Sequence, residues 1–557
     1  MSRFRITRNG FIRSSASTAA LGLAACAGGT QIGGTPSASG AGGNTGSPGA
    51  SRGTPAPGAT ATPAPGSTTT PNPGATATPA PYPSGSASTG VRGPNSLPDS
   101  TRPAGQANAN LPFDYVVVLM MENHSFDNYF GMLPVRGQPL ADGFTFGPNM
   151  VPQNKNPLSG GYQHVFHLKG TCAPYNVSQA WDATHQEVAN GTMSGFATNC
   201  DTAMGYWDES DLPFYYSLAK TFCVGNRAFC SMQGQTYPNR RYLYAATSGG
   251  LVSTTTATFT QPAPANGTLM DMMTRYGVSW KSYFSDLPAL AIVPQTLENH
   301  PANFTSIAEF FIDCAAGTLP QVSFVDPEFG LVDEVGTTLY SYLQTVPNLP
   351  ASIQDGLATL GEGINSKGGD EENPQDIAIG ELFAAQVINA AMKSPQWPRM
   401  LLVWTYDEHG GYYDHVPPLG AVEPDSIPPT ISATDAPGAF NVTGVRIPTV
   451  VVSPYSRPNA VSNVPHDHTS ILATIEAKWN LPALTYRDAQ AYTLFDYLNL
   501  SGPPAFLTPP ALAAPALPAG AGGSTCVSSP PPPVITPDVV RTRNGIKQSQ
   551  VLRSGTL

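Results

Sequence analysis

Three short apolar runs, each followed by polar residues, constrain most strongly how this chain can fold. The runs are YVVVLMM (115–121), RMLLVWTY (399–406) and RIPTVVVSPY (446–455). Continuous apolar runs of this length predict strands that are buried on both faces, as in a parallel sheet. Helical patterns at 376–394 and 469–480 alternate with these runs. The sequence therefore predicts an α/β fold with a mostly parallel central sheet and helices on both faces.

Polar clusters follow all three runs, and any one of them alone is typical of a solvated turn or a helix cap. The clusters are Glu122-Asn123-His124, then Asp407-Glu408-His409 with Asp414 and His415 soon after, and His466-Asp467-His468. In sheets of this kind, ligands bind outside the carboxyl ends of the strands. Carboxylate and amide oxygens suit Mg²⁺, Ca²⁺ or Mn²⁺, and histidine would also allow zinc or iron. We therefore expect a divalent metal site whose metal identity stays open.

The segment CSMQGQTYPNRRYLYAATSGG (230–250) offers a candidate nucleophile. Thr236 follows a glycine-containing turn and precedes a stretch compatible with a helix. A hydroxyl at a helix N-terminus beside a metal ion would have its alkoxide stabilised by both. The alternative is that Thr236 only caps the helix.

The N-terminal residues 1–26 predict an export signal, with a basic start, a short apolar stretch and small residues before a cysteine. LAAC at 23–26 resembles a bacterial lipoprotein cleavage box, so Cys26 is the expected site of a lipid anchor to a membrane. The alternative is an ordinary export signal with a chance cysteine. We expect an exported protein, either a membrane-anchored lipoprotein or a periplasmic or extracellular one.

Low-complexity sequence flanks the predicted catalytic domain at 110–502. Residues 27–109 consist almost wholly of Gly, Ala, Pro, Ser, Thr and Asn, and residues 503–557 are rich in Pro and Gly. Such segments bury too little apolar surface to offset their ordering entropy. They predict a disordered linker before the domain and a loosely held tail after it.

Net charge argues against one class of partner. The chain carries a formal charge of −11 at pH 7, whereas non-specific nucleic-acid binding requires a basic surface. We therefore expect no nucleic-acid partner.

Six cysteines remain in the chain after Cys26, an even number that suits disulfide bonds in an exported protein. Cys172 with Cys200 and Cys223 with Cys230 are the pairs expected first. Cys314 and Cys526 would form a third pair or stay free. None of the spacings is typical of a zinc site that uses thiolates.

Several long motifs resemble one known family. VVVLMMENHSFDNYFG, QTYPNRRYLYAATSG, TYDEHGGYYDHVPP and HDHTSILATIEAKWNLPALTYRDA are similar, in this order, to motifs of the bacterial phosphoesterase family. That family contains the non-haemolytic-type phospholipases C and the Francisella-type acid phosphatases. The resemblance runs from about residue 112 to 490. It implies an alkaline-phosphatase-like fold and hydrolysis of phosphate esters.

The resemblance also implies roles for individual residues. Its metal ligands fall on Glu122, Asn123, Asp407 and Glu408, and its nucleophile falls on Thr236. The implied chemistry is attack by the Thr236 alkoxide on a phosphoester, followed by hydrolysis of a phospho-threonine intermediate.

Three histidines are candidates to bind the phosphoryl oxygens or to protonate the leaving group: His468, His415 and His185. Each could equally orient another residue. Two positions that are often histidine in the family are occupied here by Gln179 and Asn373. Neither Gln nor Asn can carry a positive charge or act as an acid.

These observations favour a metal-dependent phosphoesterase with phospholipase C-like cleavage of phosphodiesters, phospholipids among them. An acid phosphatase acting on phosphomonoesters is the alternative within enzymes. A surface-binding protein with weak catalysis is the alternative from another class.

Overall fold

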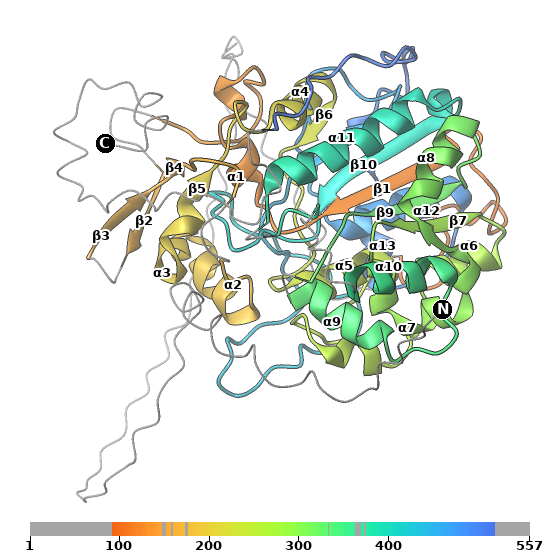
Figure 1. Ribbon diagram of the computed structural model, residues 1–557, viewed down its shortest axis with the longest axis horizontal. Helices are drawn as coiled ribbons and strands as arrows, with labels where there is room; N and C mark the ends of the chain where they lie inside the picture. Colours follow the sequence, from red (N-terminus) through yellow and green to blue (C-terminus); the bar gives the residue numbers. More distant parts are fainter. Residues whose placement is uncertain are drawn as a thin grey trace, which may run out of the picture. The chain divides into compact units, whose positions relative to one another are not determined.

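The computed structural model describes residues 92–146, 152–156, 160–172, 177–331, 334–361, 369–372 and 375–517 (Figure 1). The central sheet consists of β1 (Tyr115–Met121), β6 (Cys223–Gly225), β7 (Trp280–Phe284), β8 (Phe304–Ser306), β9 (Val322–Asp326), β10 (Met400–Tyr406), β11 (Thr449–Val452) and β12 (Ala460–Ser462). Two small sheets pair β2 (Gln153–Asn156) with β3 (Gly161–His164) and β4 (Phe166–His167) with β5 (Gly205–Tyr206).

The α-helices of the described residues lie mostly between these strands in the sequence. They are α1 (Phe126–Phe130), α2 (Trp181–Val188), α3 (Phe196–Asn199), α4 (Pro213–Thr221), α5 (Thr236–Ala245), α6 (Leu269–Arg275), α7 (Pro294–Asn299), α8 (Ile307–Ala316), α9 (Glu334–Leu343), α10 (Ala351–Gly361), α11 (Ile377–Lys393), α12 (His468–Trp479) and α13 (Tyr486–Gln490). The helices predicted at 376–394 and 469–480 are confirmed as α11 and α12.

The central sheet has the strand order β12-β6-β11-β10-β1-β9-β7-β8. Neighbouring strands pair in parallel except at β11, which is antiparallel to both β10 and β6. The predicted mostly parallel sheet is confirmed. The third apolar run nevertheless points opposite to the other two, so its carboxyl end does not lie with theirs. The cluster at 466–468 instead follows β12, which again runs in the same direction as β10.

Apolar side chains cover both faces of the sheet. Along β1, Val117, Leu119 and Met121 pack into one core with side chains of α4, α8 and α11. The alternate residues Val116, Val118 and Met120 pack into a second core with side chains of α5, α6 and α12. Figure 1 shows α11 and α8 lying over one face of β10 and β1. Two-sided burial explains why the strand sequences are continuously apolar rather than alternating.

Ordered structure extends beyond the domain boundaries predicted at 110 and 502. Before β1, Asn95 N donates to Ala483 O at 2.8 Å, and Asn480 Nδ2 donates to Arg102 O at 2.8 Å. After residue 502, the Phe506 ring packs on Phe222 with centroids 4.8 Å apart. The part of the predicted linker at 92–109 and the part of the predicted tail at 503–517 therefore belong to the folded unit. Cys26, the rest of the linker and Cys526 lie outside the described residues.

The cysteines only partly follow the expected pairing. Cys172 and Cys200 are disulfide-bonded, whereas Cys223, Cys230 and Cys314 are free and buried. The predicted pair of Cys223 with Cys230 is therefore wrong. The two side chains lie in different cores: Cys223 packs into one apolar core and Cys230 packs into the other.

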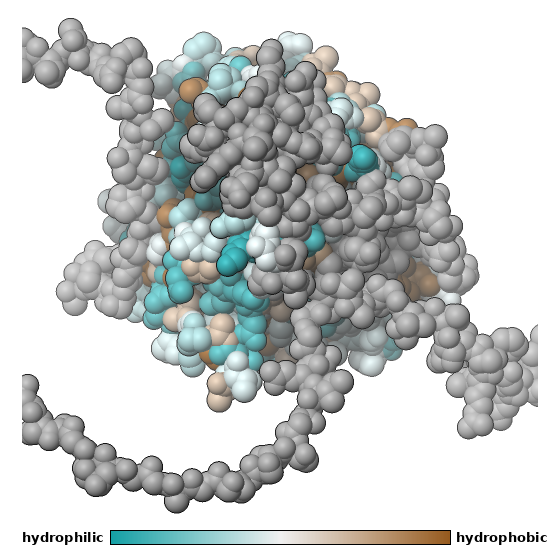
Figure 2. All heavy atoms as spheres, turned by 90° about the vertical axis from the view of Figure 1, so that its left-hand side faces the viewer, coloured by the Kyte–Doolittle hydropathy of each residue, from teal (hydrophilic) through white to brown (hydrophobic). Residues whose placement is uncertain are grey.

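The surface drawn in Figure 2 intermingles polar and apolar residues where described atoms are visible. Within the described part of the chain, no helix has the length and apolar character needed to cross a membrane.

Candidate active site

The candidate site begins where two adjacent strands end in register. β1 and β10 pair in parallel, with Met121 opposite Tyr406. The next residues, Glu122 and Asp407, therefore leave the sheet side by side. Asp407 N donates to Met121 O at 3.1 Å. The parallel register thus brings together two segments that are almost 300 residues apart in the sequence.

All four predicted metal ligands are buried at this edge. Glu122, Asp407 and Glu408 have no exposed surface, and Asn123 is 1% exposed. Asn123 adopts a positive φ of 68°, a conformation that Asn tolerates better than most residues. Its backbone N–H then donates to Asp407 Oδ1 at 3.1 Å. The structure therefore buries all four predicted ligands at the same edge of the sheet.

Arg240 supplies a positive charge that sequence reasoning missed. It lies on α5, fully buried, and forms ion pairs with Glu122 at 3.2 Å, Asp326 at 3.5 Å and Asp407 at 3.6 Å. Burial opposes the charged guanidinium, but Glu122 and Asp407 outweigh it and raise the pKa of Arg240. Burial also raises the pKa of Asp326 to about 6. Asp326 ends β9, so the rule that strand ends carry ligands could have found it.

Thr236 is the first residue of α5, and Gln235 occupies the N-cap position. Thr236 therefore does not cap the helix, which was the alternative to a nucleophile. The side chain is fully buried. Burial raises the pKa of the Asp407 carboxyl, and a hydrogen bond from the Thr236 hydroxyl lowers it in part. The hydroxyl thus faces the Asp407 carboxylate at the positive end of a helix dipole.

The donor chemistry at this edge fits a divalent cation. Asn123 Oδ1 and Glu408 Oε1 are buried without a hydrogen-bond partner among the described residues. Buried polar atoms are normally paired, so these open oxygens are donors that a cation would use. The carboxylates of Glu122, Asp407 and Glu408 are spaced wider than 4.8 Å as a set. Arg240, which pairs with two of them, lies between.

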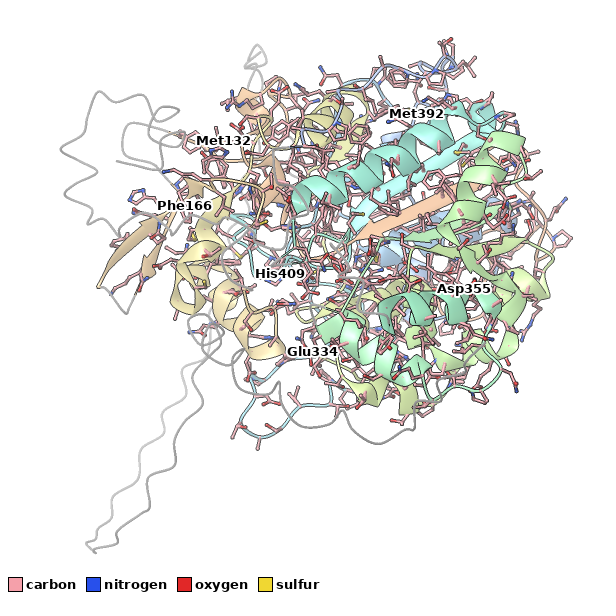
Figure 3. All side chains as sticks on the ribbon, viewed as in Figure 1. Met132, Phe166, Glu334, Asp355, Met392 and His409 are labelled. Carbon is pink, nitrogen blue, oxygen red and sulfur yellow. The ribbon has the colours of Figure 1, made fainter. Side chains whose placement is uncertain are left out.

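His409 links this edge to α2 (Figure 3). Its Nε2 lies 2.9 Å from Glu187 Oε2 on α2, and its Nδ1 lies 3.2 Å from Glu408 Oε2. Burial favours the neutral ring, but the two carboxylates outweigh it and raise the pKa of His409 to about 9. Burial raises the pKa of Glu408 to about 7 despite His409. A charged His409 therefore holds Glu408 in place.

His468 lies beside the site at the start of α12. Its Nε2 donates to Tyr406 O at 2.9 Å, and its Nδ1 lies 3.0 Å from Ser231 Oγ. Burial lowers the pKa of His468 to about 4. Both ring nitrogens are engaged and the ring is neutral, so this arrangement favours an orienting role over proton donation.

His415 belongs to a separate buried ion cluster. Its Nδ1 lies 2.6 Å from Asp127 Oδ2, and Arg446 pairs with Asp127 at 3.0 Å and with Asp414 at 2.8 Å. Burial alone would lower the pKa of His415, but Asp127 outweighs it and raises the pKa to about 10. Asp127, Asp414 and His415 are close enough together to hold a metal. Arg446 and charged His415 already neutralise these carboxylates, so the cluster is complete without one.

His185 lies on α2. Its Nδ1 is 2.7 Å from Trp181 O, and its side chain lines a hollow together with Gln233, three residues before Thr236. Of the two positions that depart from the family pattern, Gln179 Nε2 donates to Glu372 Oε1 at 3.3 Å. Asn373 lies outside the described residues.

Comparisons with known proteins identify the chain's relatives. Residues 113–482 match the Phosphoesterase family. Non-specific phospholipase C6 of Arabidopsis thaliana is 29% identical over 423 residues, covering 70% of this chain and 72% of its own length. Non-hemolytic phospholipase C of Burkholderia pseudomallei (strain K96243) is 27% identical, covering 70% of this chain and 59% of its own length. Phospholipase C B of Mycobacterium tuberculosis (strain CDC 1551 / Oshkosh) is 26% identical, covering 70% and 78%.

Solved structures give more distant matches. The lipoteichoic acid synthase LtaP from Listeria monocytogenes is 12% identical, with a TM-score of 0.31, covering 72% of this chain and 79% of that one. A protein of the alkaline phosphatase superfamily from Vibrio parahaemolyticus is 9% identical, with a TM-score of 0.28, covering 66% and 79%. The family match, which spans most of the described fold, confirms the resemblance seen in the motifs. This chain belongs to the Phosphoesterase family and is a hydrolase that acts on ester bonds.

Proposed function

We propose that this protein is a metal-dependent phosphodiesterase of the phospholipase C type, with Thr236 as its nucleophile. The observation that carries the proposal is the position of Thr236, whose hydroxyl is buried beside Asp407 at the N-terminus of α5. A metal ion held by that carboxylate and the positive end of the helix dipole would both stabilise the alkoxide of this hydroxyl. The names of the relatives, all phospholipases C, support a phosphodiester as the substrate.

Glu122, Asn123, Asp407 and Glu408 would hold the metal ion. Bound there, a divalent cation supplies positive charge for the phosphoryl oxygens and for the alkoxide of a bound hydroxyl. Three carboxylates oppose the positive charges of Arg240 and His409 at this edge. The acidic surplus is what a divalent cation would neutralise.

Thr236, Arg240 and His409 have separate roles in the two chemical steps. Thr236 Oγ attacks phosphorus, so that an O–P bond forms and the bond from phosphorus to the alcohol oxygen breaks. The hydroxyl proton ends on the departing alcohol, and water then cleaves the phospho-threonine bond. Arg240 fixes the Glu122 and Asp407 carboxylates during both steps, because it is buried and cannot lose its proton. His409 fixes Glu408 in the same way.

One assay tests this proposal. The full chain is produced in an oxidising compartment and assayed against p-nitrophenylphosphorylcholine and p-nitrophenyl phosphate from pH 4 to 9, with and without EDTA. Cleavage of the diester that EDTA abolishes and added metal restores is the expected result. Faster cleavage of the monoester at acid pH would move the assignment to an acid phosphatase. No turnover by folded, metal-loaded protein would overturn the proposal.

We further infer export and attachment to a membrane through lipidated Cys26, which rests on the sequence of residues 1–26 alone. Mass spectrometry of the mature N-terminus tests it. A diacylated cysteine at the first position is expected, and an unmodified terminus elsewhere would contradict the anchor.

A further inference from the structure

A buried carboxyl group that the proposed chemistry does not use lies among three tyrosine side chains. Glu371 has no exposed surface, and each of the three tyrosines donates a hydrogen bond to it. Tyr129 donates to Oε2 at 2.8 Å, Tyr215 donates to Oε1 at 2.7 Å, and Tyr406 donates to Oε2. We call these four residues the Glu371 cluster.

The three tyrosines come from different elements, and two of them adjoin the predicted metal ligands. Tyr406 is the last residue of β10 and directly precedes Asp407. Tyr129 lies on α1, which begins three residues after Asn123. Tyr215 lies on α4, which carries none of the predicted ligands. The cluster therefore connects both ligand-bearing segments to a single carboxyl group.

The backbone beside Glu371 holds the first ligand pair a second time. Glu122 N donates to Asp370 O at 2.9 Å. His124 Nε2 lies 3.0 Å from Glu371 O, and this ring nitrogen donates because a carbonyl oxygen can only accept. These two contacts hold the residues on either side of Asn123. The position of Asn123 thus depends on the backbone of Glu371 as well as on its side chain.

Two locally unfavourable features allow Glu371 to occupy this place. Its φ is +81°, a conformation that is strained for a residue with a side chain and that persists only where surrounding contacts hold it. Gly380 lies inside α11, where glycine is a poor helix former. A Cβ at Gly380 would lie 2.1 Å from Glu371 Cγ and 2.4 Å from its Oε1. The missing side chain at 380 therefore leaves the room that the Glu371 carboxyl fills.

The carboxyl group is held without a cation. No lysine or arginine pairs with Glu371 in the part of the chain that the structure describes. Burial raises the pKa of Glu371 to about 8, although the hydrogen bonds from Tyr406, Tyr215 and Tyr129 lower it in part. Burying such a group is unfavourable unless it is hydrogen-bonded. An apolar side chain would pack here without that cost, but it could not hold three hydroxyls at one point.

We propose that Glu371 is a positioning residue for the metal site, which sets the place of the Glu122-Asn123 pair relative to the Asp407-Glu408 pair. It acts through Tyr129 and Tyr406. The proposal rests on the proposed function, because it takes these two pairs as the metal ligands. Hydrogen-bonded partners behind a metal site orient its ligands, and their loss typically lowers metal affinity about 10- to 100-fold.

Removing one hydroxyl at a time tests this role. Tyr406→Phe and Tyr129→Phe each release one ligand-bearing segment, whereas Tyr215→Phe removes a hydroxyl from the same carboxyl on a helix without ligands. Calorimetry on chelator-treated full chain measures the dissociation constants of Mg²⁺, Ca²⁺ and Mn²⁺. The cation that the wild type binds most tightly should bind about 10-fold more weakly to the first two variants. Its affinity for Tyr215→Phe should be unchanged.

Thermal denaturation of the metal-free variants separates positioning from a purely structural role. All three variants lose one hydrogen bond to the same carboxyl, so their midpoints should decrease by similar amounts. Equal metal affinity in the three variants would overturn the inference while leaving the metal site intact. A wild-type protein that binds none of the three cations would overturn the metal-dependent function, and this inference with it.

Substitution of Glu371 gives an independent measurement. Glu371→Gln keeps the shape and one acceptor oxygen, so it should retain most of the metal affinity. Glu371→Leu keeps no acceptor and should lose about 10- to 100-fold. Gly380→Ala should also weaken metal binding, because it displaces the Glu371 carboxyl, although alanine is the better helix former. Wild-type affinity in both Glu371→Leu and Gly380→Ala would contradict the positioning role. If Glu371→Leu does not fold, the tyrosine variants decide the question.

Discussion

Arg240 Nη2 lies 3.2 Å from Glu122 Oε1, and this contact joins the helix that starts at Thr236 to the end of strand β1. Thr236 and Arg240 are four residues apart on α5, so they lie on the same face of the helix. The ion pair therefore fixes the position of the Thr236 hydroxyl relative to the end of strand β1.

Replacement of Thr236 tests the nucleophile. Thr236→Ala should abolish turnover, because no other hydroxyl in the described site takes its position. Thr236→Ser should retain measurable activity, since it keeps the oxygen. Metal content by elemental analysis should be unchanged in both variants. Full activity in the alanine variant would remove Thr236 from the mechanism.

Asp407→Asn tests the metal ligands. The loss of one negative charge should weaken metal binding, which is measured as metal content after dialysis against a chelator. Asp355→Asn is the matched control, because Asp355 is exposed on α10 (Figure 3). Unchanged metal retention in Asp407→Asn would count against its role as a ligand.

Arg240→Met should destabilise the metal-free protein. Removing the guanidinium leaves Glu122, Asp326 and Asp407 buried without their cation, and such a change typically costs about 3–5 kcal/mol. Chemical denaturation of chelator-treated protein measures the free energy of unfolding. Arg240→Lys keeps the charge and should lose less. A stability equal to wild type in the methionine variant would show that these carboxylates are balanced by other groups.

His415 should make stability depend on pH. Its folded pKa is raised from 6.5 to about 10. The stabilisation by the Asp127 pair is therefore fully present below pH 6.5 and is lost as the pH rises through 10. The denaturation midpoint should decrease more between pH 6 and pH 10 for the wild type than for His415→Gln. Parallel pH dependence in the two proteins would contradict a charged His415.

The cysteines can be tested by alkylation in denaturant without reductant. Cys223, Cys230 and Cys314 should be labelled, whereas Cys172 and Cys200 should react only after reduction. Peptide mass spectrometry identifies the modified positions. Protection of Cys223 and Cys230 before reduction would restore the pairing that their sequence spacing suggested.

The sheet and the two main strands of the site could be predicted from the sequence, because buried parallel strands leave continuous apolar runs. The reversal of β11 could not, since an apolar run does not record its direction. Arg240 was missed for a related reason. A charged residue in a helical pattern is usually exposed to solvent. Only the fold shows that Arg240 contacts the residues that follow β1 and β10.

The histidines were the hardest to interpret, because an imidazole's role depends on which partners the fold supplies. His415 and His468 follow strand ends in the sequence, yet carboxylates hold the first and a hydroxyl and a carbonyl hold the second. His185 lies in a helix without a recognisable strand signal, and its surroundings come from a segment about 250 residues away.

The pairing of Met121 with Tyr406 also limits how this chain can change. A substitution in β1 or β10 alters packing locally, but a single-residue deletion within either strand would slide one half of the site past the other by about 3.3 Å. It would also turn the side chains that follow to the opposite face. Variation among working descendants of this sequence should therefore spare the lengths of these two strands and gather in the loops that follow them.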